Sequence, residues 1–143
     1  MPYRFLPDIA TADVAFEAIG ASVEEMFVAA ADATMNVMVE DLSSIVPRER
    51  RAIDVSSDSL DMLLFEFLQE LIFYKDAEQL LLRAPRIALE SDEGTFRLSA
   101  EAEGETIDRG RHPFNVDVKA VTLHRFQVEE TPDGWRATVI LDI

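Results

Sequence analysis

The sequence has no cysteine and few basic residues. The missing cysteine excludes disulfides, thiolate metal sites and cysteine nucleophiles, and is compatible with the cytoplasmic location that we expect. Lysine and arginine number 13 against 28 aspartates and glutamates, a formal net charge of −15. Because affinity for nucleic acids comes from basic side chains that displace counterions, we expect no tight direct binding of RNA or DNA. A basic protein partner suits this charge better.

The chain also lacks a long apolar run of the kind found in signal peptides and membrane-spanning helices. We therefore expect no membrane association. No internal repeat, linker or low-complexity segment divides the sequence. Nearly half of the residues, 48%, are apolar, so a folded core is expected rather than disorder. We expect residues 1–143 to form a single domain.

Two segments carry apolar residues at helical spacing. The first begins at Ser22, and Glu25 three residues later completes the pattern of a capping box. Its apolar face continues to Met38. The second is capped by Ser57 or Asp58 and is apolar on more than one side. We expect this second helix to be the central, more buried one.

Alternation with period two predicts strands in the rest of the chain. The expected strands and turns are 13–19, 52–55, a hairpin that turns at 92–94, a long strand at 115–129, a turn at 131–134 and a terminal strand at 135–143. Strands, two helices and a run of hairpin-linked strands favour an α+β fold. We expect two main helices packed on a mostly antiparallel sheet.

The long strand and the loop before it hold the histidines and one lysine of interest. Strand parity places His124 on the apolar face, as a buried, hydrogen-bonded side chain. His112 belongs to the one basic cluster, residues 108–113, which is either a solvated loop or a contact surface for an acidic group. Lys119 shares the polar face with Asp117, either as a solvated pair or as an ammonium that faces a site or partner.

Two aspartates stand at strand ends: Asp13 at the start of the first strand and Asp142 in the last. Each is either an ordinary exposed carboxylate or a metal ligand. An ordered end of the chain would place the terminal carboxylate of Ile143 beside Asp142, and such neighbours repel unless a cation or protons neutralise them. With no thiolate and only two histidines, any ion here is expected to be a hard cation held by oxygens, of the calcium or magnesium class.

Short segments spread over the whole chain resemble the archease family. The matching segments, in the family's order, are 10–14 (Ala-Thr-Ala-Asp-Val), 63–64 and 68–72 of the leucine-rich helix, 111–112 (Arg-His), 118–124 and 139–143. The resemblance implies an archease-like fold and a protein that is not an enzyme. It implies an activator of an RtcB-type RNA ligase, which promotes GTP-dependent guanylylation and multiple turnover in tRNA splicing and RNA repair.

The resemblance also implies roles for particular residues. Asp13, Asp142 and the Ile143 carboxylate correspond to the family's metal ligands, and Lys119 to its ligase-activating lysine. Ala10 departs from the histidine usual there. Two other functions stay open: a metal-dependent phosphohydrolase that uses Asp13 and Asp142, for which the sequence offers no assigned general base, and a chaperone-like binding module, which needs an exposed apolar patch.

Overall fold

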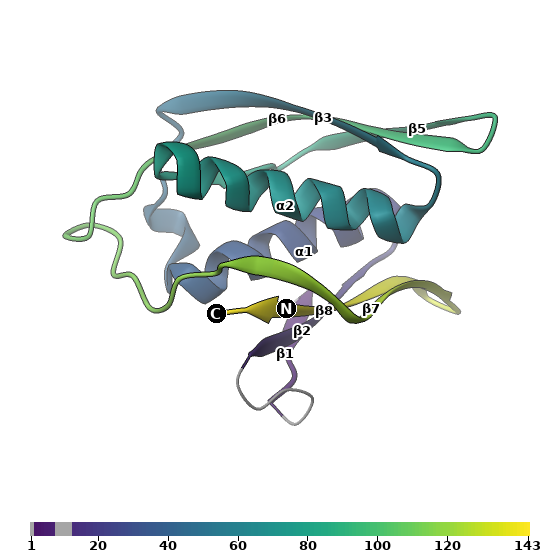
Figure 1. The fold of residues 1–143 in the computed structure, drawn as a ribbon, viewed down its shortest axis with the longest axis horizontal. Helices are drawn as coiled ribbons and strands as arrows, with labels where there is room; N and C mark the ends of the chain where they lie inside the picture. Colours follow the sequence, from purple (N-terminus) through teal and green to yellow (C-terminus); the bar gives the residue numbers. More distant parts are fainter. Residues whose placement is uncertain (1, 8–12) are drawn as a thin grey trace.

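Two antiparallel sheets enclose two helices in the computed structural model, which describes residues 2–7 and 13–143 (Figure 1). The α+β class, with two main helices packed on antiparallel sheets, is confirmed. The elements are β1 (Tyr3–Phe5), β2 (Val14–Gly20), α1 (Val23–Met38), the short 3-10 helix η1 (Leu42–Ser44), β3 (Glu49–Ser57), α2 (Leu60–Glu78), β4 (Leu80–Arg83), β5 (Ile87–Asp92), β6 (Thr95–Thr106), β7 (Ala120–Thr131) and β8 (Gly134–Asp142).

The first sheet has the strand order β1-β2-β8-β7, so it pairs the beginning of the chain with its end. The second has the order β3-β6-β4, and β5 also pairs with β6. In the first sheet, Val14 is the partner of Leu141, and Ala120 is the partner of Asp142. The start of β2, the end of β8 and the start of β7 therefore lie together at one end of this sheet. This row of strand ends is the sheet edge that carries the predicted metal ligands.

The first helix begins as the sequence predicts. The Ser22 hydroxyl accepts a hydrogen bond from the backbone N–H of Glu25, at 3.1 Å. The Glu25 carboxylate accepts in return from the backbone N–H of Ala21, at 2.9 Å, one residue earlier than in the standard capping box. The first of these bonds satisfies a backbone donor that the first turn of a helix leaves without an intrahelical partner.

The two helices differ in burial, and here the sequence prediction was wrong. Ten of the 16 residues of α1 are buried, against seven of the 19 residues of α2. Helix α1 lies between the sheets and contacts β2 and β8 on one side and β4 on the other (Figure 1). Its buried alanines allow this close approach of strands on two sides. The extra apolar residues of α2 partly face solvent instead, and Phe73 is 54% exposed.

The N-cap of helix α2 lies two residues or one residue later than the expected caps, Ser57 or Asp58. Ser59 caps the helix by accepting from the backbone N–H of Met62, at 3.4 Å, whereas Ser57 is still part of β3 and pairs with Phe96. At the other end, Gln79 adopts a left-handed backbone with φ of 55°. This residue turns the chain directly into β4, a strand that the sequence analysis did not identify because it follows the helix without a turn signal.

Strand β7 is shorter and less regular than expected. Residues 115–119 form a connection rather than a strand, and pairing with β8 begins at Ala120. Between Thr122 and Gln127 the register shifts, and Arg125 has a positive φ of 55°. Such a bulge changes which face each later side chain occupies. Parity arguments that assume one continuous strand therefore do not hold here.

Within the described residues, no helix is long and apolar enough to cross a membrane.

Candidate functional site

The edge of the first sheet where β2 begins brings two predicted ligands together. Asp13 directly precedes Val14, whose partner is Leu141, so the register extended by one residue sets Asp13 opposite Asp142. Both aspartates are partly exposed. The antiparallel pairing of the first long strand with the last one thus brings Asp13 and Asp142, from opposite ends of the sequence, to the same end of the sheet.

Lys119 reaches the same edge from the connection before β7. Its backbone N–H donates to the carbonyl oxygen of Asp142, at 2.8 Å, and its side chain is exposed. The expected pairing of Lys119 with Asp117 on one strand face was wrong, because Asp117 is bound to Lys75 instead, at 2.6 Å. Among the described residues no acidic side chain forms an ion pair with Lys119.

Lys75 holds the connection that carries Lys119. It is only 4% exposed, and its ammonium donates to the carboxylates of Asp76 and Asp117 and to the carbonyl oxygen of Val118, the last at 2.8 Å. An ammonium has three protons, and all three have acceptors here. Sequence reasoning missed Lys75, although it follows Ile72 by three residues on the buried stripe of α2.

The donor atoms at this edge fit a hard divalent cation. Asp13 and Asp142 offer carboxylate oxygens, the ligand type that calcium and magnesium prefer. Across residues 2–7 and 13–143, neither aspartate side chain forms a hydrogen bond or ion pair, and no three histidine, aspartate or glutamate side chains form a metal cluster. Residues 10–12 of the matching segment lie outside the described residues.

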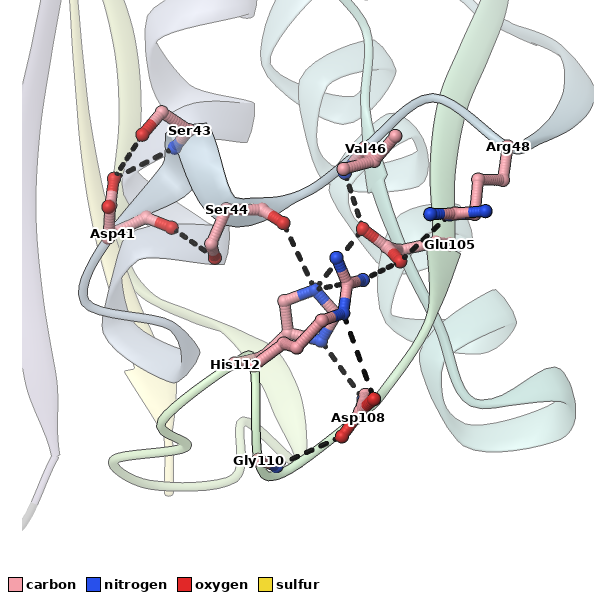
Figure 2. A network of polar contacts seen from close by, with 10 residues as sticks. Asp41, Ser43, Ser44, Val46, Arg48, Glu105, Asp108, Gly110 and His112 are labelled. Carbon is pink, nitrogen blue, oxygen red and sulfur yellow. Dashed lines mark hydrogen bonds and ion pairs between the residues drawn. The ribbon is translucent and has the colours of Figure 1, made fainter.

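A second polar cluster surrounds Glu105, which is 4% exposed at the end of β6 (Figure 2). Its carboxylate accepts from the backbone N–H of Val46, at 2.5 Å, and pairs with the guanidinium of Arg111. Arg48 lies 3.6 Å away and the Nε2 atom of His112 3.3 Å away. Residues 108–113 thus do contact an acidic group, but it is one of the protein's own.

His112 is fully buried, which excludes a solvated loop, one of the two readings that the sequence left open for residues 108–113. The backbone N–H of Asp108 donates to its Nδ1 atom, at 2.9 Å, which makes Nδ1 an acceptor and leaves the proton on Nε2. Nε2 lies 3.2 Å from the carbonyl oxygen of Ser44 (Figure 2). His112 therefore fastens the loop after β6 to η1, a structural role.

Asp41 caps η1 next to the Glu105 cluster. Hydrogen bonds from the Ser43 hydroxyl and from the Ser43 backbone N–H hold the pKa of Asp41 below its ordinary value. His124, by contrast, is exposed beside the bulge of β7, so its predicted burial was also wrong. The bulge moves His124 off the apolar face.

The two-sheet fold and the carboxylate-bearing sheet edge define a small α+β protein whose candidate site is open to a partner rather than enclosed. Over residues 3–143 the sequence matches the model of the archease protein family, and the chain belongs to that family. The resemblance found from the sequence segments is confirmed.

Individual relatives cover nearly the whole chain. The protein named "Protein archease" of Thermococcus gammatolerans is 38% identical over 134 residues, which are 93% of this chain and 94% of that one. The protein of the same name from Methanosarcina barkeri is 35% identical, with 93% and 91% covered.

Two solved structures are also similar. The solution structure of Methanobacterium thermoautotrophicum protein 1598 has a TM-score of 0.86, 33% identity and 99% coverage of both chains. The crystal structure of an archease from Thermotoga maritima, described as a possible chaperone, has a TM-score of 0.59, with 94% of this chain and 93% of that one covered. Its 19% identity shows the shared fold alone.

Proposed function

We propose that this chain activates an RtcB-type RNA ligase, by promoting its GTP-dependent guanylylation and multiple turnover, and does not itself act on RNA. The observation that supports this most directly is the sheet edge where Asp13, Asp142 and Lys119 meet. In a member of the archease family, these are the residues to which the sequence resemblance assigned metal binding and ligase activation. Both aspartates are partly exposed and the Lys119 side chain is exposed, so a partner can reach all three.

In this proposal Asp13, Asp142 and the main-chain carboxylate of Ile143 hold one ion of the calcium or magnesium class. Such an ion, when bound, supplies positive charge at the surface that meets the ligase and its nucleotide. The protein's own part is positional. Strand pairing sets the two aspartates opposite each other, and the bond from Lys119 N–H to Asp142 sets the lysine beside them.

The phosphohydrolase alternative has less support. Metal-assisted hydrolysis needs a base near the metal as well as an open coordination position. Of the two histidines, His112 is buried in the Glu105 cluster, and His124 lies in the bulged part of β7, beyond the paired residues next to the sheet edge. Neither is placed to serve Asp13 and Asp142.

A multiple-turnover ligation assay tests the proposal. Limiting cognate ligase is incubated with GTP and RNA ends, with and without this protein and its variants Asp13→Asn, Asp142→Asn and Lys119→Met. The wild type is expected to raise turnover, and each variant to lose most of that gain while its melting temperature stays unchanged. Asp92→Asn, at the tip of the β5–β6 hairpin, is the matched control and is expected to activate normally.

Two outcomes would favour the alternatives. Saturable phosphoester hydrolysis by the protein alone, lost in Asp13→Asn, would establish a hydrolase. Suppression of aggregation of unfolded proteins, without any effect on ligase turnover, would establish a chaperone-like module. Normal ligase activation by all three variants would rule out the proposed site, even if the wild-type protein does activate the ligase.

A further inference from the structure

A groove lies at the opposite end of the first sheet from the candidate metal site. It has a volume of about 870 Å³ and runs between the start of α1, the β7–β8 turn and the segment before β5. Strand β2 starts next to Asp13 and ends in this groove at Gly20, and β8 runs in the reverse direction. The two surfaces are separated by the length of β2, roughly 20 Å at about 3.3 Å per residue.

Two glycines allow the groove to form. A Cβ atom on Gly134, which has a φ of +146°, would lie 2.2 Å from the carbonyl oxygen of Gly20. The β7–β8 turn therefore rests directly on the end of β2. This close approach leaves the neighbouring large side chains at the groove: Trp135 is partly exposed, and Ile19 is 47% exposed. Both line it together with Val28 of α1.

The charged side chains around this apolar floor are mostly acidic. The groove is lined by four acids and two arginines: Glu24, Glu25, Asp32, Asp133, Arg86 and Arg136. Arg83 pairs with Asp32, and Glu129 pairs with Arg136, so these two charges are already compensated. The remaining lining charges are three carboxylates, those of Glu24, Glu25 and Asp133, and one guanidinium, that of Arg86. The net charge of −15 strengthens this local excess.

We infer that this surface, the Trp135 groove, binds a segment of a partner protein that carries a basic side chain next to an apolar one. The apolar side chain packs against Ile19, Val28 and Trp135. The basic side chain meets the acids at the rim and the face of the indole, which attracts cations. An acidic segment is repelled. The inference rests on the proposed function only where it names the ligase as the partner.

Trp135 is the only tryptophan of the chain, so its fluorescence reports directly on the groove. The probes are two tryptophan-free peptides, acetyl-Arg-Leu-Phe-Arg-amide and acetyl-Glu-Leu-Phe-Glu-amide. The basic peptide is expected to change the emission saturably, and the acidic one is not. Ile19→Lys is expected to weaken binding about tenfold, equivalent to ~1.4 kcal/mol. Glu24→Lys should weaken it by a similar factor.

Matched controls separate a local effect from a change in net charge. Phe73→Lys likewise replaces an exposed apolar side chain by lysine, and Glu66→Lys repeats the Glu-to-Lys change, both on α2, which does not line the groove. Both are expected to bind the basic peptide as the wild type does. The inference is overturned if the emission does not saturate, if both peptides bind alike, or if the control variants lose as much affinity as the groove variants.

Calorimetric titration with the cognate ligase then tests the identity of the partner. Ile19→Lys should weaken ligase binding about tenfold, with Phe73→Lys unchanged. If the groove binds the basic peptide but Ile19→Lys leaves ligase affinity intact, the ligase is not the occupant of the groove. If the ligase is never activated, the proposed function fails, and the peptide titration still decides on the groove.

Discussion

The connection between β6 and β7, residues 107–119, is held near both ends by a buried charge, and the two charges have opposite signs. At its start, the buried carboxylate of Glu105 is surrounded by arginines, a histidine and a backbone N–H. At its end, the buried ammonium of Lys75 is surrounded by two carboxylates and a carbonyl oxygen. In both clusters the central charge is buried while its ion-pair partners among Asp, Lys and Arg remain partly in water.

The difference between the clusters lies in what they hold. The Glu105 cluster ties the connection to η1 and to the segment before β3 (Figure 2). The Lys75 cluster continues through Val118 and Lys119 to the backbone of Asp142. The same kind of interaction therefore serves stability at one end and the geometry of the proposed site at the other.

The largest effect is expected from Glu105→Ala. It removes the acceptor shared by Val46, Arg111 and His112, and we expect a loss of about 3 kcal/mol in the free energy of unfolding, because buried donors are left without partners. Urea unfolding followed by Trp135 fluorescence measures this. Glu101→Ala, on the same strand with an exposed partner Arg50, is the control and should cost less than about 0.5 kcal/mol. Equal losses of unfolding free energy in Glu105→Ala and Glu101→Ala would show that the buried cluster adds no more stability than an exposed ion pair.

Lys75→Met should cost somewhat less, about 2 kcal/mol, because Asp76 and Asp117 can return to water and mainly the Val118 carbonyl loses a buried partner. Hydrogen exchange distinguishes it from Glu105→Ala. The backbone N–H of Lys119 should exchange faster in Lys75→Met, and that of Val46 faster in Glu105→Ala. Ligase activation should fall in Lys75→Met but not in Glu105→Ala. The same pattern of exchange in both variants would mean that the two clusters form one unit.

A smaller effect is expected when one acidic partner of Lys75 is neutralised. Asp117→Asn should cost about 0.5 kcal/mol, in the range for a half-exposed ion pair, and Asp76→Asn less, because Asp76 neighbours Lys75 in the same helix and orders no other segment. Double-mutant cycles with Lys75→Met measure both coupling energies. A coupling of Asp76 equal to that of Asp117 would show that the connection gains nothing from its ion pair.

The smallest effect belongs to an exposed pair, Asp54 with Arg97, which tests whether burial is what matters. The hydrogen bonds from Arg97 lower the pKa of Asp54 below 3.8, so the pair stabilises the fold above that pH and the contribution disappears as pH falls below it. Asp54→Asn should leave stability at neutral pH nearly unchanged. Only a slight flattening of the stability curve in acid is expected. If Asp54→Asn lost as much unfolding free energy as Lys75→Met, burial would not be what distinguishes strong charge clusters from weak ones.

Local sequence signals predicted a good part of the fold. The capping residues Ser22 and Glu25, the turn at residues 92–94 and the turn at residues 131–134 all occur where expected, because each depends on side chains within a few residues. The strand register brings the predicted residues Asp13 and Asp142 to the same end of the sheet, and the backbone of Lys119 bonds to that of Asp142. Metal binding and ligase activation stay predictions.

The environments of the histidines and of Lys75 could not be predicted in this way. His124 was expected on the buried apolar face but is exposed, and His112, expected in a solvated loop or on a contact surface, is fully buried. Strand parity failed because a bulge, for which no clear residue signal exists, interrupts β7. Lys75 and Asp117 are 42 residues apart, so no local pattern connects them.

The sequence by itself thus determined the composition, the acidic surface, the helix start and turns, and the resemblance that assigns the chain to its family. Only the tertiary structure decided which helix is more buried, where the charges are buried, and how β2 and β8 align. That alignment sets Asp13 beside Asp142 at one end of the sheet and opens the Trp135 groove at the other. The reason is physical: caps and turns form from neighbouring residues, whereas burial and register follow from packing distant segments together.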